Sequence, residues 1–177
     1  MPGAPEHKKT PVPIATGFRH AAIRFVIASL NPDPELKVSA QYNPKELQID
    51  QTYTWTPHTA TDKGDHDDPF LQEFNGVQPS TMKVELFFDG YEHGKSVDAQ
   101  INVLRTLAQV KENSPKDDIR PYFCICTWGK GLKFQCVIES LSVKYTMFAN
   151  DGTPLRATVT VGLKEAKRVS QKRDKKK

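Results

Sequence analysis

The sequence lacks several features that would place it in a large protein class. It has no run of 18 apolar residues, which excludes a membrane-spanning helix. Its first residues lack the apolar core of a signal peptide. It has only three cysteines, and so low and odd a number argues against a disulfide framework and fits a reducing compartment. We therefore expect assembly in the cytoplasm.

Motifs that carry chemistry are also missing. The chain has no GxSxG sequence, no glycine-rich phosphate loop after a strand and no HExxH helix. None of its five histidines stands beside a cysteine or serine in a recognisable pattern. We therefore expect neither an enzyme nor a cofactor.

The positive charge lies mostly at one end. The net charge is +4, but residues 164–177 hold eight basic and two acidic residues, so this end carries +6 and the rest about −2. A nucleic-acid-binding domain would carry its basic patch on the fold. Nucleic acid is therefore an improbable partner.

What is present is a clear β pattern between residues 122 and 164. In its last run Leu155, Ala157 and Val159 alternate with polar residues, and a period of two indicates a strand with one buried face. A similar run begins at Leu132. Gly129-Lys130-Gly131 and Asn150-Asp151-Gly152 are typical of hairpin turns. The pattern predicts a three-stranded antiparallel meander, which needs a second layer.

Further segments supply that layer. Strands are predicted at 22–28, 36–42, 47–56 and 81–89. A helix is predicted from an N-cap at Ser96 to about Asn113, with apolar residues on one stripe. The chain is thus predicted to be α+β and mainly antiparallel, a small barrel or sandwich of about seven strands with one helix.

The segment 57–80 is predicted to be a long polar loop. Loops of this length in compact domains are usually functional or disordered. It contains Phe70, Leu71 and Phe74, which suggests docking onto a neighbour. Its acidic and histidine residues from His58 to Asp68 could also be metal ligands, but they match no known spacing, so a hydrated acidic loop is favoured.

The cysteines permit a geometric test. If Trp128 pairs with Leu132, then Cys124 faces Cys136 across the hairpin. A disulfide or a shared metal is then possible in principle. We favour buried free cysteines that pack as small hydrophobic residues.

The ends differ in composition from the centre. Residues 1–17 are rich in proline and are expected to form a flexible arm, 18–165 the β domain and 166–177 a flexible basic tail. The tail could contact an anionic partner. Its basic residues are Lys167, Arg168, Lys172, Arg173, Lys175, Lys176 and Lys177.

Five segments carry a family resemblance. They are 38–47 (VSAQYNPKEL), 82–92 (MKVELFFDGYE), 126–129 (CTWG), 132–142 (LKFQCVIESLS) and 145–157 (YTMFANDGTPLRA). In this order and spacing they resemble the tube-type N-terminal domain of contractile injection system proteins. Many of those proteins continue into a LysM-like module, which this sequence does not contain.

The resemblance implies a structural protein that forms a homo-hexameric ring around a channel. Strands of neighbouring copies would continue the sheet around the ring. The ring would join the inner tube protein above to the trimeric spike or hub protein below in a phage-tail-like particle. Baseplate or sheath subunits are further possible partners, and the tail would replace the missing module as a contact.

Two other readings stay open. One is a non-catalytic β-barrel that binds an anionic ligand or nucleic acid through its basic tail. The other is a metal-dependent hydrolase that uses the segment from His58 to Asp68. The adaptor ring is favoured because the motifs match in order and no active-site motif is present.

Overall fold

A computed structural model describes residues 23–30, 35–57, 70–110 and 119–167. Within these ranges it contains nine strands, a short 3-10 helix η1 (Tyr91–His93) and one α-helix. In chain order the strands and the α-helix are β1 (Phe25–Ser29), β2 (Lys37–Ser39), β3 (Leu47–Asp50), β4 (Tyr53–Pro57), β5 (Gln72–Val77), β6 (Thr81–Asp89), α1 (Asp98–Ala108), β7 (Cys124–Trp128), β8 (Leu132–Phe148) and β9 (Pro154–Glu165). No helix in this part of the chain is long and apolar enough to cross a membrane.

Seven strands form one antiparallel sheet in the order β2-β1-β7-β8-β9-β6-β3. The predicted meander is confirmed as β7, β8 and β9, with Trp128 paired to Leu132. The predicted strand at 81–89 is confirmed as β6, with Phe87 on the face opposite the buried Met82, Val84 and Leu86. The fold class is therefore α+β and mainly antiparallel, as predicted.

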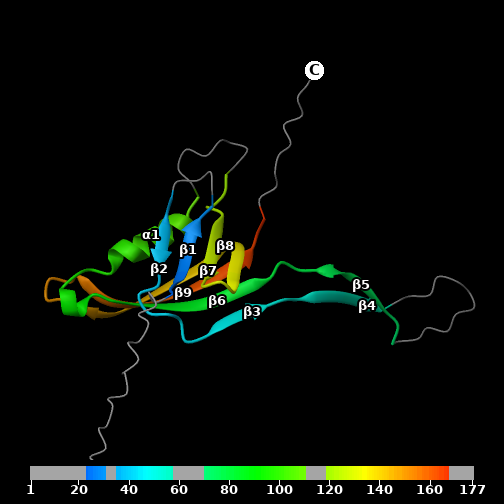
Figure 1. Cartoon of the computed structure of the whole chain (residues 1–177), viewed down its shortest axis with the longest axis horizontal. Helices are drawn as coiled ribbons and strands as arrows, with labels where there is room; N and C mark the ends of the chain where they lie inside the picture. Colours follow the sequence, from blue (N-terminus) through cyan, green and yellow to red (C-terminus); the bar gives the residue numbers. More distant parts are fainter. Residues whose placement is uncertain (1–22, 31–34, 58–69, 111–118, 168–177) are drawn as a thin grey trace, which may run out of the picture.

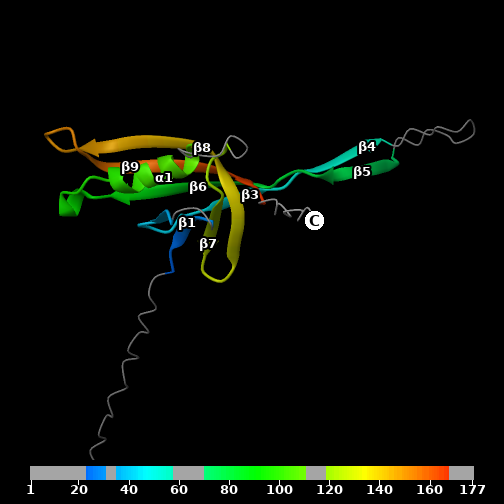
Figure 2. The same cartoon turned by 90° about the horizontal axis from the view of Figure 1, so that it is seen from above.

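The long strand β8 joins the two halves of this sheet. Its first residues pair with β7 as far as Cys136, and from Cys136 onward it pairs with β9. Register shifts after Ile138 and after Tyr145 bend the strand, as β-bulges do. The half with β1, β2 and β7 therefore stands over the half with β9, β6 and β3 (Figures 1 and 2). The result is a small sandwich that does not close into a barrel.

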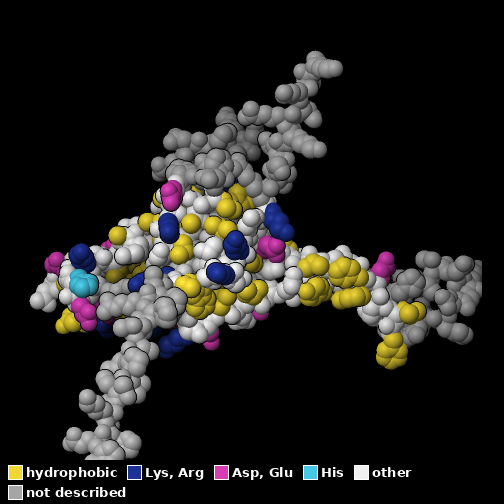
Figure 3. Space-filling view, in the orientation of Figure 1, with side chains coloured by type: hydrophobic (Ala, Val, Ile, Leu, Met, Phe, Trp, Pro, Cys, Tyr) yellow, Lys and Arg dark blue, Asp and Glu magenta, His cyan; other side chains and the backbone are white. Residues whose placement is uncertain are grey.

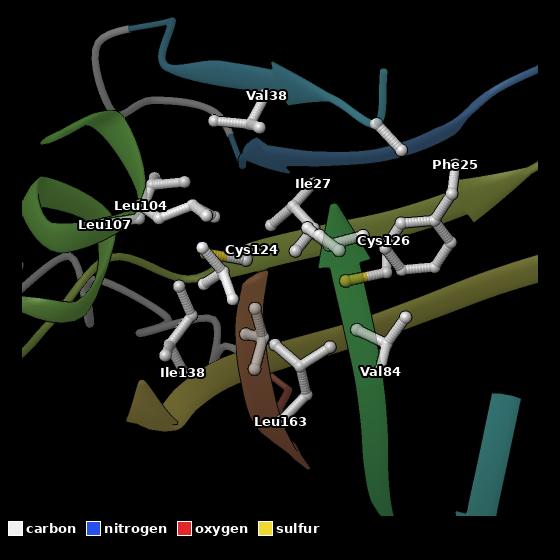
Figure 4. Packing of buried hydrophobic residues seen from close by; sticks show 14 of the residues in the cluster. Phe25, Ile27, Val38, Val84, Leu104, Leu107, Cys124, Cys126, Ile138 and Leu163 are labelled. Atoms are coloured by element: carbon white, nitrogen blue, oxygen red, sulfur yellow. The ribbon is translucent and has the colours of Figure 1, made fainter. Parts of the chain in front are cut away.

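The core lies between the two halves (Figure 4). Phe25 and Ile27 of β1 face Val84 and Leu163 of the other half, and all four are almost fully buried. Helix α1 contacts β8 and β2 and adds the buried residues Ile101, Leu104 and Leu107. The amphipathic stripe predicted for the helix thus covers the open side of the sandwich.

The pair β4–β5 forms a second sheet, which projects from the body as an arm (Figures 1 and 2). This corrects two predictions. The single strand predicted at 47–56 is two strands, since β3 pairs with β6 whereas β4 pairs with β5. The loop predicted at 57–80 contains strand β5. Pro79 lies between β5 and β6 and has no N–H to donate, so the ladder breaks there.

Other boundaries also differ from the prediction. The described helix ends at Ala108 because Gln109 is extended, and Asn113 lies outside the described residues. The N-cap position is Val97. Ser96, one residue earlier, accepts a hydrogen bond from the N–H of Asp98. Tyr42, the last residue of the strand predicted at 36–42, is about half exposed, because β2 ends at Ser39.

Asn43, in the sequence Tyr42-Asn43-Pro44, fixes the start of β1 by hydrogen bonds. The side chain of Asn43 accepts a hydrogen bond from the N–H of Phe25 at 3.2 Å and donates one to the carbonyl of Ile23 at 2.8 Å. Pro44 beside it is buried. The motif therefore connects two segments about twenty residues apart in the chain.

Replacing Asn43 with alanine should lower the free energy of unfolding by about 1–2 kcal/mol, because both hydrogen bonds are lost. Asn43→Asp keeps the acceptor for Phe25 and loses only the donor, so its loss should be smaller. Urea unfolding of the two variants and the wild type measures the difference. Equal stability of Asn43→Ala and the wild type would contradict this role.

Candidate assembly surfaces

One face of the arm is apolar and exposed. Tyr53 lies opposite Val77 and Trp55 opposite Phe74 in the strand pair, and the rings of Trp55 and Phe74 are 5.0 Å apart. Each of these side chains is about half exposed. Apolar side chains gather along the arm in Figure 3. A two-stranded hairpin is marginally stable alone, so this apolar face is suited to contact another surface.

The other face of the arm is polar. Thr54 and Thr56 lie there, and the Thr56 hydroxyl bonds the side chain of Asn75 at 3.1 Å. The register shift after Thr54 leaves Asn75 without an opposite residue. The arm therefore has two different faces, as expected of a strand pair that is to be covered on one side only.

The three residues predicted to contact a neighbour lie at this arm. Phe74 belongs to β5 and to the apolar face, whereas Phe70 and Leu71 precede the strand. Phe70 is 88% exposed, the most exposed large apolar side chain among the described residues, and Leu71 is 49% exposed. The sequence predicts these three contact residues but not Trp55 and Val77 as their neighbours. These residues are brought together by the pairing of β4 with β5, which the sequence does not predict.

The base of the arm is hydrogen-bonded to β9. Ser80 is buried, and its hydroxyl donates a hydrogen bond to Oε2 of Glu165 at 2.9 Å. The backbone N–H of Ser80 donates to the same oxygen, and the N–H of Glu165 donates to the carbonyl of Ser80 at 2.7 Å. These hydrogen bonds from Ser80 hold the pKa of Glu165 below its usual range.

The part of the large sheet formed by β8, β9, β6 and β3 has two open edges within the described residues. From Val137 to Phe148, β8 pairs with β9 only, so its other side carries unpaired backbone groups. At the opposite edge, β3 pairs with β6 only. Figure 2 shows β8 at the rim of the body, beyond β9 and β6. Unpaired edges are templates for pairing with another chain.

The outer face of this part of the sheet is polar and mostly small. It presents Ser140 and Ser142 from β8 and Thr158 and Thr160 from β9. Arg156 donates two hydrogen bonds to Asp89 on the same face, at 3.0 and 2.6 Å. These bonds lower the pKa of the Asp89 carboxyl.

A groove of about 830 Å³ opens on this face between β6 and the segment before β3. Tyr42 and Phe87 form one wall, with their rings 5.7 Å apart. Beyond them, the side chain of Gln41 bonds both backbone groups of Asp89 and closes the edge of β6 there. Glu46 and Glu85 also line the groove.

The three cysteines are free and buried. Cys124 pairs with Cys136 and Cys126 with Phe134, as the sequence predicted. The closest sulfur atoms belong to Cys126 and Cys136, at 3.6 Å. That contact and burial raise the pKa of Cys126. The burial of all three thiols agrees with the expectation that they pack as small hydrophobic residues.

Other predicted site residues cannot be placed. The histidine and acidic residues from His58 to Asp68 lie outside the described residues, as does the basic tail from Arg168 onward. Of the basic residues of that tail only Lys167 is described, and its amine lies 3.6 Å from Glu165. Among the described residues, no three His, Cys, Asp or Glu side chains are grouped as metal ligands.

The hydrogen bonds at the base of the arm should make stability depend on pH. The pKa of Glu165 is lower in the folded than in the unfolded protein, so its stabilisation is present at neutral pH and is lost as the pH falls through the folded pKa. The difference in unfolding free energy between the wild type and Glu165→Gln should therefore shrink below about pH 4.3.

Chemical denaturation from pH 7 to pH 3 measures this difference. Asp89 also has a lowered pKa, but it is present in both proteins and cancels in the comparison. In a Ser80→Ala background, the pH dependence assigned to Glu165 should largely disappear. A constant difference between the wild type and Glu165→Gln across the range would contradict the assignment.

Comparison with known proteins identifies the family of this chain. A family model described as contractile injection system tube protein matches residues 23–174, which include all nine described strands and helix α1. No curated protein matches the chain. The chain belongs to the contractile injection system tube protein family and has a structural role in such a system.

Proposed function

We propose that this protein forms a ring that joins the inner tube of a contractile injection system to its baseplate hub. The observation that carries the proposal is the pair of open edges on β8 and β3, at opposite sides of the part of the sheet formed by β8, β9, β6 and β3. A single copy leaves these edges unpaired. A closed ring of copies would pair every one of them.

The strand directions support a cyclic arrangement. Three antiparallel pairings separate β8 from β3, through β9 and β6. These two edge strands therefore run in opposite directions. Copies in the same orientation can add β8 of one to β3 of the next and keep the sheet antiparallel. Such head-to-tail contacts generate rings when the rotation closes.

We propose that six copies surround the channel. This number rests on the resemblance of the sequence motifs to the family. The outer face of β8, β9 and β6 would then line the channel. Its serine and threonine side chains suit a wall along which other molecules pass, because they offer neither an apolar patch nor a strong field of one sign. This role requires no catalysis.

The arm supports contacts beyond the ring. It projects from the body (Figure 1), and its apolar face has no partner among the described residues. We propose that it contacts a neighbouring copy or the adjoining layer of the particle. The inner tube protein would lie on one side of the ring and the trimeric spike or hub protein on the other, with assembly in the cytoplasm.

Replacing Phe70 and Phe74 together with serine should prevent ring assembly and leave the monomer folded. Both side chains are exposed, so their loss removes little core packing, whereas a docking surface would lose its apolar anchors. Negative-stain electron microscopy measures ring formation, and circular dichroism measures the fold.

The matched control is Ile119→Ser, which removes an exposed apolar side chain from the body and should leave rings intact. The wild type is imaged alone and after co-expression with the tube and spike proteins of the same particle. Normal rings of the double variant would rule out the arm as an assembly contact. A wild type that stays monomeric in both settings would overturn the proposed function itself.

A further inference from the structure

The two open edges have complementary side chains on both faces of the sheet. On the outer face, the β3 edge presents Glu46, Gln48 and Asp50 in alternate positions, with Glu46 directly before the strand. The β8 edge presents Ser140, Ser142 and Lys144. The β3 edge thus carries two carboxylates, whereas the β8 edge carries hydroxyl donors and an ammonium group. The carboxylate of Glu139, directly before Ser140, is already paired with Lys164.

The inner faces of the two edges also match, because both carry apolar residues. Ile49 of β3 is 48% exposed although it lies on the side of the core. Leu141 and Val143 of β8 are only partly buried and pack against the core. A neighbouring β8 beside β3 would cover Ile49 with apolar side chains, which favours a second copy of this chain as the occupant.

Two carboxylates of the groove, those of Glu46 and Glu85, form no ion pair with a described residue. Because Leu47 pairs with Val84, Glu46 lies opposite Glu85, and like charges in opposite positions are destabilising. No ion pair involves Glu46, Glu85 or Lys144 in the part of the chain that the structure describes. Lys45 and Lys83 also line the groove, but neither forms an ion pair with these carboxylates.

The register that brings these charges together follows from two constraints. Strands in a closed barrel must be staggered. The stagger must also be an even number of residues, since an odd shift would turn apolar side chains outward. The smallest such shift is two residues. Lys144 pairs with Thr158, and Glu85 pairs with Thr160. A shift of two in one direction places Lys144 of one copy level with Glu46 and Glu85 of the next, and a shift in the other direction places Ser140 there. Only the first brings opposite charges together.

We propose that Lys144 of each copy enters the groove of its neighbour and forms ion pairs with Glu46 and Glu85, which fixes the register of the ring. This proposal rests on the proposed function, because it needs copies joined edge to edge. The partner is a second copy of this chain, and the contact is electrostatic. Assembly should therefore weaken as salt is added.

A charge exchange tests the contact. Lys144→Glu should raise the protein concentration needed for half-maximal ring assembly by about tenfold, because three carboxylates then meet at each junction. The double variant Glu46→Lys, Glu85→Lys should assemble as poorly, since it brings three lysines together. Combining the three changes restores opposite charges and should recover most of the assembly. Sedimentation velocity over a concentration series measures each value.

The control is Lys130→Glu, an equal charge change in the turn between β7 and β8, which should assemble like the wild type. Thermal unfolding verifies that every variant is folded, and Lys144→Gln replaces Lys144→Glu if the latter is not. Wild-type assembly by the folded Lys144 variant, or a triple variant no better than its parents, would overturn the proposal while the ring remains. A wild type that forms no ring would overturn both this proposal and the proposed function.

Discussion

The structure depends on the bend in strand β8. This one strand of 17 residues pairs with β7 at its start and with β9 over the rest of its length. Without the bend the apolar residues of the two halves would lie side by side on one open face, and Phe25 and Ile27 would not meet Val84 and Leu163. The same bend leaves the second part of β8 without a neighbour on one side, so the core and the open edge have a common origin.

The sequence predicts the elements whose side chains alternate between core and solvent. β9 is the clearest case, because buried residues from Leu155 to Leu163 alternate with partly exposed ones, and β6 is similar. Strand β5 shows no such alternation, since five of its six residues are exposed and the sixth is Gly76. Its strand conformation depends on pairing with β4, and no local pattern reports a partner that lies elsewhere in the chain.

The same limit applies to the assembly surfaces. Phe70 and Phe74 could be predicted as contact residues because apolar side chains in a polar segment are visible in the sequence. The open edges could not, since an edge is defined by the absence of a neighbouring strand and requires the whole strand order. Likewise, the sequence places Cys124 opposite Cys136, but only the packing brings the sulfur of Cys126 closest to that of Cys136.

The burial of all three cysteines has a practical consequence for labelling. Thiol reagents attack exposed thiolates, and Cys124, Cys126 and Cys136 are all buried. A cysteine introduced on the polar face of the arm, for example at Thr54, would therefore be the preferred site for a fluorescent or spin label in the folded protein. The three native cysteines would then stay unlabelled, as distance measurements between copies require.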